Sequence, residues 1–187
     1  MIGGIGLRKV LRSFLLNLMG EYSTEKLEKI GLKVGRNFSR QAQCIIDHSH
    51  CWLIKIGDDV TLAPKVHILA HDASTKQSLG YTKIGLVNIG DRVFIGAGSI
   101  ILPNVNIGND VIIGAGSIVT KNIPDNSVAV GNPAKVVCTK SDYINKNREF
   151  IKNRPVYNKE WTIRKNITED MKQKMIESLK DGIGFVE

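Results

Sequence analysis

The chain has 187 residues, of which 42% are hydrophobic, so it is long enough for one domain and too apolar for a disordered chain. Its formal net charge of +8 favours anionic partners such as a phosphate-bearing cofactor, but basic and aromatic residues are not interleaved, so no nucleic-acid partner is expected. The three cysteines lack the spacing of metal ligands and indicate free thiols in a reducing compartment, the cytoplasm.

Residues 1–31 are predicted to be helical, because apolar side chains recur there at helical spacing beside Arg8, Lys9 and Arg12. The apolar run is too short to span a bilayer, and no small-residue cleavage site follows its basic start, so a signal peptide is not expected. Two alternatives remain for this segment. It packs on the following domain or a neighbouring subunit, or residues 1–20 form an amphipathic helix that contacts a membrane surface.

Residues 32–137 carry a repeat of six residues. The segment Ile95–Ile100 (IGAGSI) recurs eighteen residues later as Ile113–Ile118. Aliphatic residues keep the six-residue period at Ile89, Ile95, Ile101, Ile107, Ile113 and Val119. A short fixed period is the signature of a solenoid, and three hexads make one triangular coil. The sequence therefore predicts an all-β solenoid, a parallel β-helix with helical N- and C-terminal segments.

The repeat is interrupted at about residues 74–87, a polar stretch that is expected to leave the stack of coils as a functional loop. Residues 138–187 form a polar, basic C-terminal extension with two predicted helices. The first is capped by Ser141 and ended by Pro155, and the second is capped by Thr168. The terminal segments are expected to cover the open ends of the solenoid.

Histidine is the residue type best suited to general-base catalysis at neutral pH. The chain has four histidines, and His71 stands where the repeat stops and the inserted loop begins. A coil edge beside a loop offers both a rigid position and access for a substrate. The residue types alone leave a second interpretation open, that His71 is a polar surface residue at the root of the loop.

Several segments together resemble the left-handed β-helix acyltransferases, most closely the maltose/galactoside and polysaccharide O-acetyltransferases. These segments are the hexads, Ile56–Val60 (IGDDV), Ala63-Pro64, His71-Asp72 before the loop and Gly131–Lys135 (GNPAK). The resemblance covers about residues 32–138. It implies a left-handed helix, a homotrimer with active sites at subunit interfaces, acetyl-CoA as co-substrate and no metal.

The resemblance also implies roles for single residues. His71 corresponds to the histidine that takes the proton of an acceptor hydroxyl as its oxygen attacks the acetyl-CoA thioester. Backbone groups at Ala97 and Ala115 correspond to those that bind the pantetheine arm of the cofactor. Lys121 and Lys135 correspond to positions near the nucleotide end, so they are the expected phosphate contacts.

For the acceptor, the resemblance places Asp47 near a substrate-contacting acid and Phe94 near an aromatic residue that lines the site. For Asp47 a second interpretation stays open, that of a structural aspartate in a turn. The chain departs from the maltose-type pattern between Val66 and His71, where it is shorter, and in the loop that follows. The expected function is acetyl-CoA-dependent O-acetylation of a saccharide or polysaccharide-precursor hydroxyl, in the cytoplasm or peripherally at the inner membrane surface.

Two other functions are compatible with the same repeat. The γ-type carbonic anhydrases share the fold and bind a metal through three histidines, but the spacing of His67 and His71 is one residue short of that family's pair. A non-catalytic scaffold subunit would not bind CoA and would leave His71 beside a long loop unexplained. Metal analysis and CoA binding distinguish these alternatives.

Overall fold

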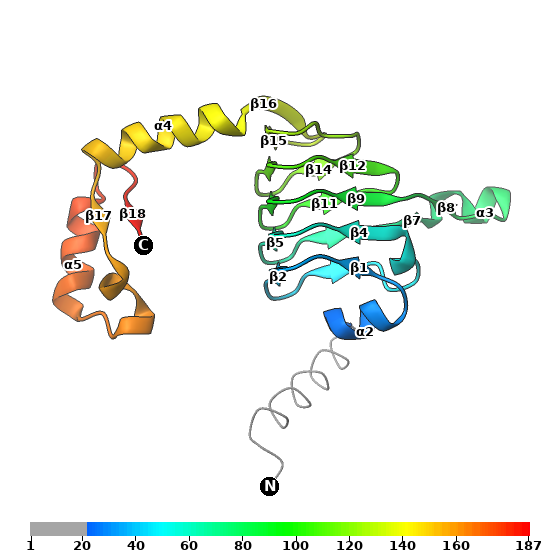
Figure 1. Cartoon of the computed structure of the whole chain (residues 1–187), viewed down its shortest axis with the longest axis horizontal. Coiled ribbons are helices and arrows are strands. Elements are labelled where there is room, and N and C mark those ends of the chain that lie inside the picture. The colour runs from blue at the N-terminus through cyan, green and yellow to red at the C-terminus, as the bar shows by residue number, and fades with distance from the viewer. Residues whose placement is uncertain (1–21) are drawn as a thin grey trace, which may run out of the picture. The chain divides into compact units, whose positions relative to one another are not determined.

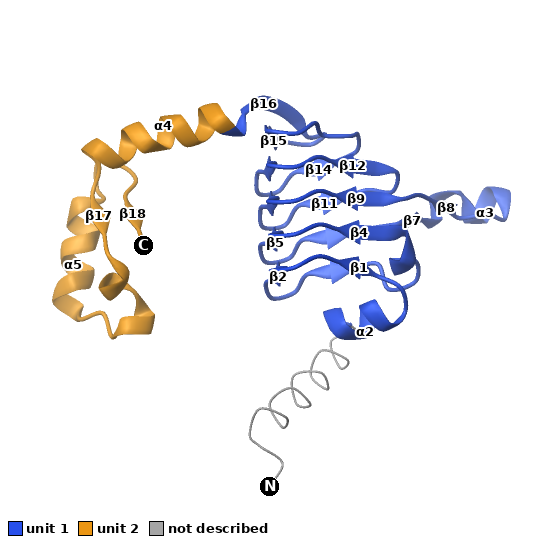
Figure 2. Ribbon diagram, viewed as in Figure 1, with its two compact units in different colours: residues 1–140 blue, residues 141–187 orange. Residues whose placement is uncertain are grey.

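The computed structural model describes residues 22–187, so the helix and membrane contact predicted for residues 1–20 lie outside the described residues. The chain divides into two compact units, the first ending at Lys140 and the second spanning Ser141–Glu187 (Figure 2). Within residues 22–187, no helix has both the length and the apolar character needed to cross a bilayer.

The first unit is a stack of coils, and most coils add one short strand to each of three parallel sheets (Figure 1). The first sheet contains β1 (Lys33–Val34), β4 (Ile54–Ile56), β9 (Val87–Ile89) and β12 (Val105–Ile107). The second contains β2 (Ser39–Arg40), β5 (Thr61–Leu62), β10 (Phe94–Ile95), β13 (Ile112–Ile113) and β15 (Ser127–Val130), with β16 (Lys135–Thr139) at its edge. The third contains β3 (Ile45–Ile46), β6 (His67–Ile68), β11 (Ile100–Ile101) and β14 (Ile118–Val119). Parallel strands in this order are what the six-residue period predicts.

Aliphatic side chains from successive coils fill the interior of the stack. The register pairs Ile95 with Leu62 on one side and with Ile113 on the other, so equivalent repeat positions lie above one another. All three side chains are fully buried. Burying such a side chain stabilises the fold by about 1.5–3 kcal/mol, so the aliphatic positions of the hexads supply much of the stability of the stack.

The two ends of the stack are closed in different ways. At the first coil, helix α2 (Thr24–Lys29) begins after Ser23, whose side chain accepts the backbone N–H of Lys26, and its Leu27 is buried in the common core. At the last coil, β16 pairs with β15 in the antiparallel direction and so ends the parallel series.

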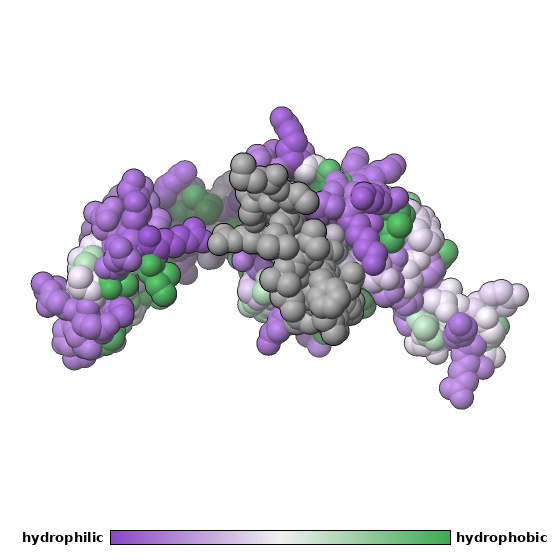
Figure 3. Space-filling view, turned by 90° about the horizontal axis from the view of Figure 1, so that it is seen from below, coloured by the Kyte–Doolittle hydropathy of each residue, from purple (hydrophilic) through white to green (hydrophobic). Residues whose placement is uncertain are grey.

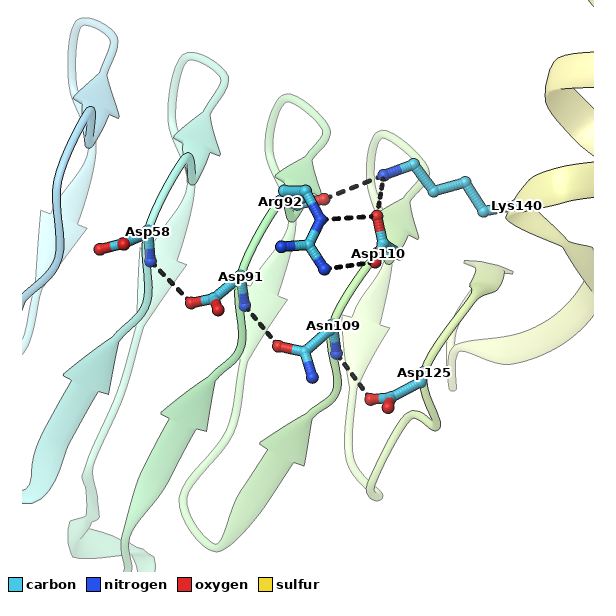
Figure 4. Close-up of polar contacts among 7 residues, drawn as sticks. All are labelled: Asp58, Asp91, Arg92, Asn109, Asp110, Asp125 and Lys140. Carbon is cyan, nitrogen blue, oxygen red and sulfur yellow. Dashed lines mark hydrogen bonds and ion pairs between the residues drawn. The ribbon is translucent and has the colours of Figure 1, made fainter.

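A ladder of Asp and Asn side chains links neighbouring coils along one corner of the stack (Figure 4). Asp58 donates its backbone N–H to the Asp91 carboxylate at 2.8 Å, and Asp91 donates its own to the Asn109 side chain at 2.8 Å. Asn109 in turn donates its N–H to Asp125 at 2.7 Å. The residue before each of the three donors is glycine, and a Cβ there would clash with the accepting side chain: at Gly57 it would lie 2.3 Å from the Asp91 oxygen.

A second polar group beside this ladder holds the chain where it leaves the stack (Figure 4). Arg92 binds Asp110 through two nitrogens at 3.0 and 2.7 Å, and Lys140 reaches the same carboxylate at 3.2 Å. The hydrogen bond from Arg92 outweighs partial desolvation and, together with Lys140, lowers the pKa of Asp110 to about 2. Lys140 is the first residue of α4 (Lys140–Asn153), so this group anchors the start of that helix.

The inserted segment projects from the stack as a hairpin (Figure 1). It consists of β7 (His71–Asp72), the 3-10 turn η2 (Ala73–Thr75), α3 (Lys76–Leu79) and β8 (Lys83–Ile84), with β7 and β8 antiparallel. An ion pair of 2.6 Å between Lys83 and Asp72 joins the two strands. The excursion thus begins at His71, a few residues before the predicted loop, and Val87 already belongs to β9, where it is fully buried.

The second unit contains most of α4, the pair β17 (Val156–Tyr157) and β18 (Phe185–Val186), the turns η3 (Lys159–Trp161) and η4 (Ile163–Lys165), and α5 (Glu169–Ser178). Ser141 lies inside α4 and does not cap it, because the helix begins at Lys140. Thr168 does cap α5, its side chain accepting the Met171 N–H at 3.2 Å. None of the residues 141–187 is buried, and apolar side chains reach the surface of this unit among hydrophilic ones (Figure 3).

Candidate active site

The third sheet brings His71 and Asp47 together. Asp47 directly follows β3, and His71 comes three residues after the end of β6. Because β3 and β6 are neighbours with Ile46 opposite Ile68, the chain segments that leave them run side by side. The His71 Nδ1 atom lies 2.5 Å from the Asp47 Oδ2 atom. The stacking of two coils therefore converts residues 24 positions apart in sequence into a hydrogen-bonded pair.

The Asp47 carboxylate is held rigidly beneath His71. Its Oδ1 accepts the backbone N–H of Ser49 at 3.0 Å, and its Oδ2 accepts that of Ala70 at 3.0 Å as well as binding His71. Burial by itself would raise the pKa of Asp47, but the hydrogen bonds from His71, Ala70 and Ser49 outweigh it and hold the pKa below its ordinary value. Asp47 is therefore a carboxylate at neutral pH.

This geometry determines which nitrogen of His71 is available for chemistry. The Asp47 side chain is 1% exposed, whereas that of His71 is 34% exposed, so the imidazole lies between a buried carboxylate and the surface. A carboxylate acceptor at Nδ1 favours the tautomer that carries its proton there. The Nε2 atom then has a free lone pair and can accept a proton from a substrate, and Asp47 stabilises the imidazolium that forms.

His50 is the third titratable residue of this cluster. It precedes the 3-10 turn η1 (Cys51–Leu53), and its ring lies 5.1 Å from that of His71 and 5.4 Å from that of Trp52, centroid to centroid. One ligand atom each from Asp47, His50 and His71 lie within 4.8 Å of one another. No role for His50 follows from the sequence, because the irregular turn after it breaks the six-residue count that would place it.

The other predicted site residues lie elsewhere on the stack, and all five are accessible. Phe94 is 45% exposed on β10, Ala97 lies at the corner between β10 and β11, and Ala115 occupies the equivalent corner between β13 and β14. That corner joins the second sheet to the third and precedes the strands of the third sheet, whereas His71 follows a strand of the third sheet. Lys121 follows β14, on the same side of the third sheet as His71 and two strands along. Lys135 begins β16.

Comparison with known proteins identifies the family to which a chain with these features belongs. The model of the bacterial transferase hexapeptide family (six repeats) matches residues 87–121. Protein CapG of Staphylococcus aureus is 39% identical over 132 residues, which are 66% of this chain and 75% of CapG. The putative acetyltransferase YvoF of Bacillus subtilis (strain 168) is 34% identical over 111 residues, which are 59% of this chain and 62% of YvoF.

Among solved structures, a maltose O-acetyltransferase from Clostridium difficile 630 is similar, with 48% sequence identity, a TM-score of 0.50 and 57% of each chain covered. The chain thus spans three quarters of CapG but less than two thirds of YvoF and of the Clostridium protein. The likeness to CapG extends well beyond the matched repeats and includes a large part of both chains. This chain belongs to the hexapeptide-repeat acyltransferases.

Proposed function

We propose that this protein transfers an acetyl group from acetyl-CoA to a hydroxyl of a saccharide or polysaccharide precursor, with His71 as the general base. The observation that carries the proposal is the hydrogen bond between His71 Nδ1 and the buried Asp47 carboxylate. The similarity to a maltose O-acetyltransferase and to the putative acetyltransferase YvoF supports acetyl transfer as the reaction. The family resemblance further gives the stack of coils a left-handed sense.

The proposed reaction is a direct transfer. His71 Nε2 takes the proton of the acceptor hydroxyl while the hydroxyl oxygen bonds to the thioester carbonyl carbon. The tetrahedral intermediate then collapses, the bond from carbon to sulfur breaks, and the imidazolium returns its proton to the departing CoA thiolate. A positioned base of this kind contributes roughly 10²–10⁴-fold to the rate. Asp47 keeps the ring in the required tautomer throughout.

The cofactor would lie along the coil corners. Backbone groups at Ala97 and Ala115 would bind pantetheine, and Lys121 and Lys135 would contact the phosphates. Since Ala97 and Ala115 lie at a different corner from His71, we propose that the site is completed in a homotrimer, where the corner of one subunit faces His71 of the next.

The inserted hairpin fits the same assembly. Its apolar residues Leu79, Tyr81 and Ile84 are 65%, 79% and 59% exposed, which suits a segment that covers a neighbouring subunit. Phe94 would line the acceptor side of the interface. The prediction that Asp47 contacts the acceptor directly stays a prediction, but its 1% exposed side chain favours a role beneath His71 instead.

The test is thiol release from acetyl-CoA in the presence of a panel of mono- and oligosaccharides, for wild type, His71→Ala and the control His67→Ala. His67 lies four residues earlier on β6 and is not part of the Asp47 cluster. We expect acceptor-dependent release that falls at least about 100-fold in His71→Ala, with CoA binding retained. Acceptor-dependent release at the wild-type rate in His71→Ala would refute the assignment of the base.

A further inference from the structure

We propose that Asp47, His50 and His71 form a divalent-metal site that matches Zn²⁺, and that metal bound there inhibits acetyl transfer. Metal binding follows from the cluster itself, and the inhibition rests on the proposed function of His71. The site would act as a regulatory or poisoning site and would take no part in the transfer reaction.

The ligand set is the first reason. Two imidazoles and one carboxylate, with further positions left to water, are a known zinc ligand combination. A tetrahedral Zn²⁺ with ordinary bond lengths needs ligand atoms about 3.4 Å apart. The ligand atoms of Asp47, His50 and His71 lie within 4.8 Å of one another, and the Asp47 Oδ2 and His71 Nδ1 atoms are only 2.5 Å apart, so side-chain rotations that separate this pair are needed to admit the ion.

The environment of His50 is the second reason, and it is independent of the first. Its Nδ1 atom is buried and has no hydrogen-bond partner among residues 22–187. A buried polar nitrogen without a partner is unfavourable, and such atoms in native structures call for an explanation. A metal ion that accepts the nitrogen lone pair supplies one, and the centroid of the His50 ring lies 5.1 Å from that of His71.

The rigidity of the remaining ligands is the third reason. Backbone N–H groups of Ser49 and Ala70 fix the Asp47 carboxylate, and this carboxylate in turn orients His71. Asp47 and His71 are therefore already neighbours before a metal arrives, and the ion would replace the hydrogen that they share. Outer hydrogen bonds that orient a ligating carboxylate are a regular feature of protein metal sites.

Metal binding has a direct consequence for the base. An ion between Asp47 Oδ2 and His71 Nδ1 takes the Nδ1 lone pair, so the neutral ring must carry its hydrogen on Nε2. A protonated ring would instead release one proton to solvent on binding. In both cases Nε2 holds a hydrogen and cannot accept the proton of an acceptor hydroxyl, so the metal-bound protein cannot use His71 as a base.

The first experiment measures binding without reference to activity. The full-length protein is stripped with EDTA, dialysed and titrated with Zn²⁺ against a colorimetric chelator, as wild type, His50→Phe and His48→Phe. His48 is a matched control, because it is exposed, precedes His50 by two residues and stacks on Tyr22 at 4.7 Å away from the cluster. We expect one Zn²⁺ per chain, an affinity at least about tenfold weaker in His50→Phe, and no change in His48→Phe. Equal affinities in wild type and His50→Phe would overturn the proposal.

A second measurement decides the matter if His50→Phe does not fold. Wild-type protein titrated with Co²⁺ should develop the intense visible bands of a four- or five-coordinate nitrogen–oxygen site. A weak octahedral spectrum identical to that of Co²⁺ in buffer would contradict a three-ligand site.

Inhibition is measured last. Zn²⁺ should abolish thiol release by the wild type in a manner reversed by EDTA, and His50→Phe should resist it by at least about tenfold. Undiminished release from a Zn²⁺-saturated wild type would overturn the inhibition. Absence of acetyl transfer with every acceptor would instead count against the proposed function and leave the metal titration as it stands.

Discussion

Replacing Asp47 with asparagine tests whether a buried carboxylate keeps His71 in the tautomer that can act as a base. The two oxygens of Asp47 accept hydrogen bonds from Ser49, Ala70 and the His71 ring. Asparagine offers one oxygen and one NH₂ group in the same space, so at least one of these donors faces another donor. If the NH₂ group faces Nδ1, the ring must accept there and carry its hydrogen on Nε2.

The magnitude follows from these contacts. One buried donor left without an acceptor costs about 1–3 kcal/mol, so we expect Asp47→Asn to lower the free energy of unfolding by that amount. The wrong tautomer removes most of the roughly 10²–10⁴-fold contribution of a positioned base. We therefore expect kcat to fall at least about 100-fold, whereas the KM for acetyl-CoA stays within a factor of about three, because Asp47 is buried and takes no part in the proposed cofactor contacts.

The pH dependence of stability gives an independent reading. The folded-state pKa of Asp47 is lowered, so its stabilising contribution is present above the ordinary aspartate pKa of about 3.9 and is lost as pH falls through the folded value. Urea unfolding of wild type and Asp47→Asn should converge as pH falls below about 4. A variant with wild-type kcat and wild-type stability at pH 7 would refute this account of the pair.

Three further predictions concern the coil corners. Asp91→Ala leaves the backbone N–H of Asp58 without its acceptor and should cost about 1–2 kcal/mol in urea unfolding, whereas Asp91→Asn keeps the oxygen and should cost less than about 0.5 kcal/mol; equal losses would contradict the ladder. Gly96→Ala places a Cβ 2.4 Å from the backbone nitrogen of Ala115 and should lower stability by about 1–3 kcal/mol, and an unchanged melting temperature would show that the corner is not close-packed. The pKa of Asp110 is lowered to about 2, so its contribution to the free energy of unfolding is complete above about pH 4 and is lost toward about pH 2. Asp110→Asn should remove this part of the acid dependence of stability. At neutral pH it should cost at most about 1 kcal/mol, because the pair of Arg92 and Asp110 is exposed.

The repeat made the core predictable from the sequence. A period of six places Ile95 and its equivalents on the inner face of every coil, and the structure buries them at that register. Local signals at helix ends were less reliable. Thr168 has the side-chain oxygen that a helix start requires and caps α5, but Ser141 does not cap α4, because the antiparallel β16 leads directly into a helix that begins at Lys140.

The site was predictable in its residues more than in its contacts. His71 stands out in the sequence because the repeat stops there, and the family resemblance gives Asp47 a different role, contact with the acceptor. Their pairing depends on the register of β3 against β6. The chain between these two strands contains the irregular turn η1, so this register cannot be predicted by counting hexads. No role for His50 follows from the sequence for the same reason, since its position is defined only once this turn is folded.

The role of His71 is best measured as the single-turnover rate of acetyl transfer, with enzyme in excess over acetyl-CoA and a saturating saccharide acceptor. This rate isolates the chemical step from product release. We expect His71→Ala to lower this rate at least about 100-fold while the Kd for CoA stays unchanged. A single-turnover rate equal to that of the wild type would contradict the assignment of His71 as the general base.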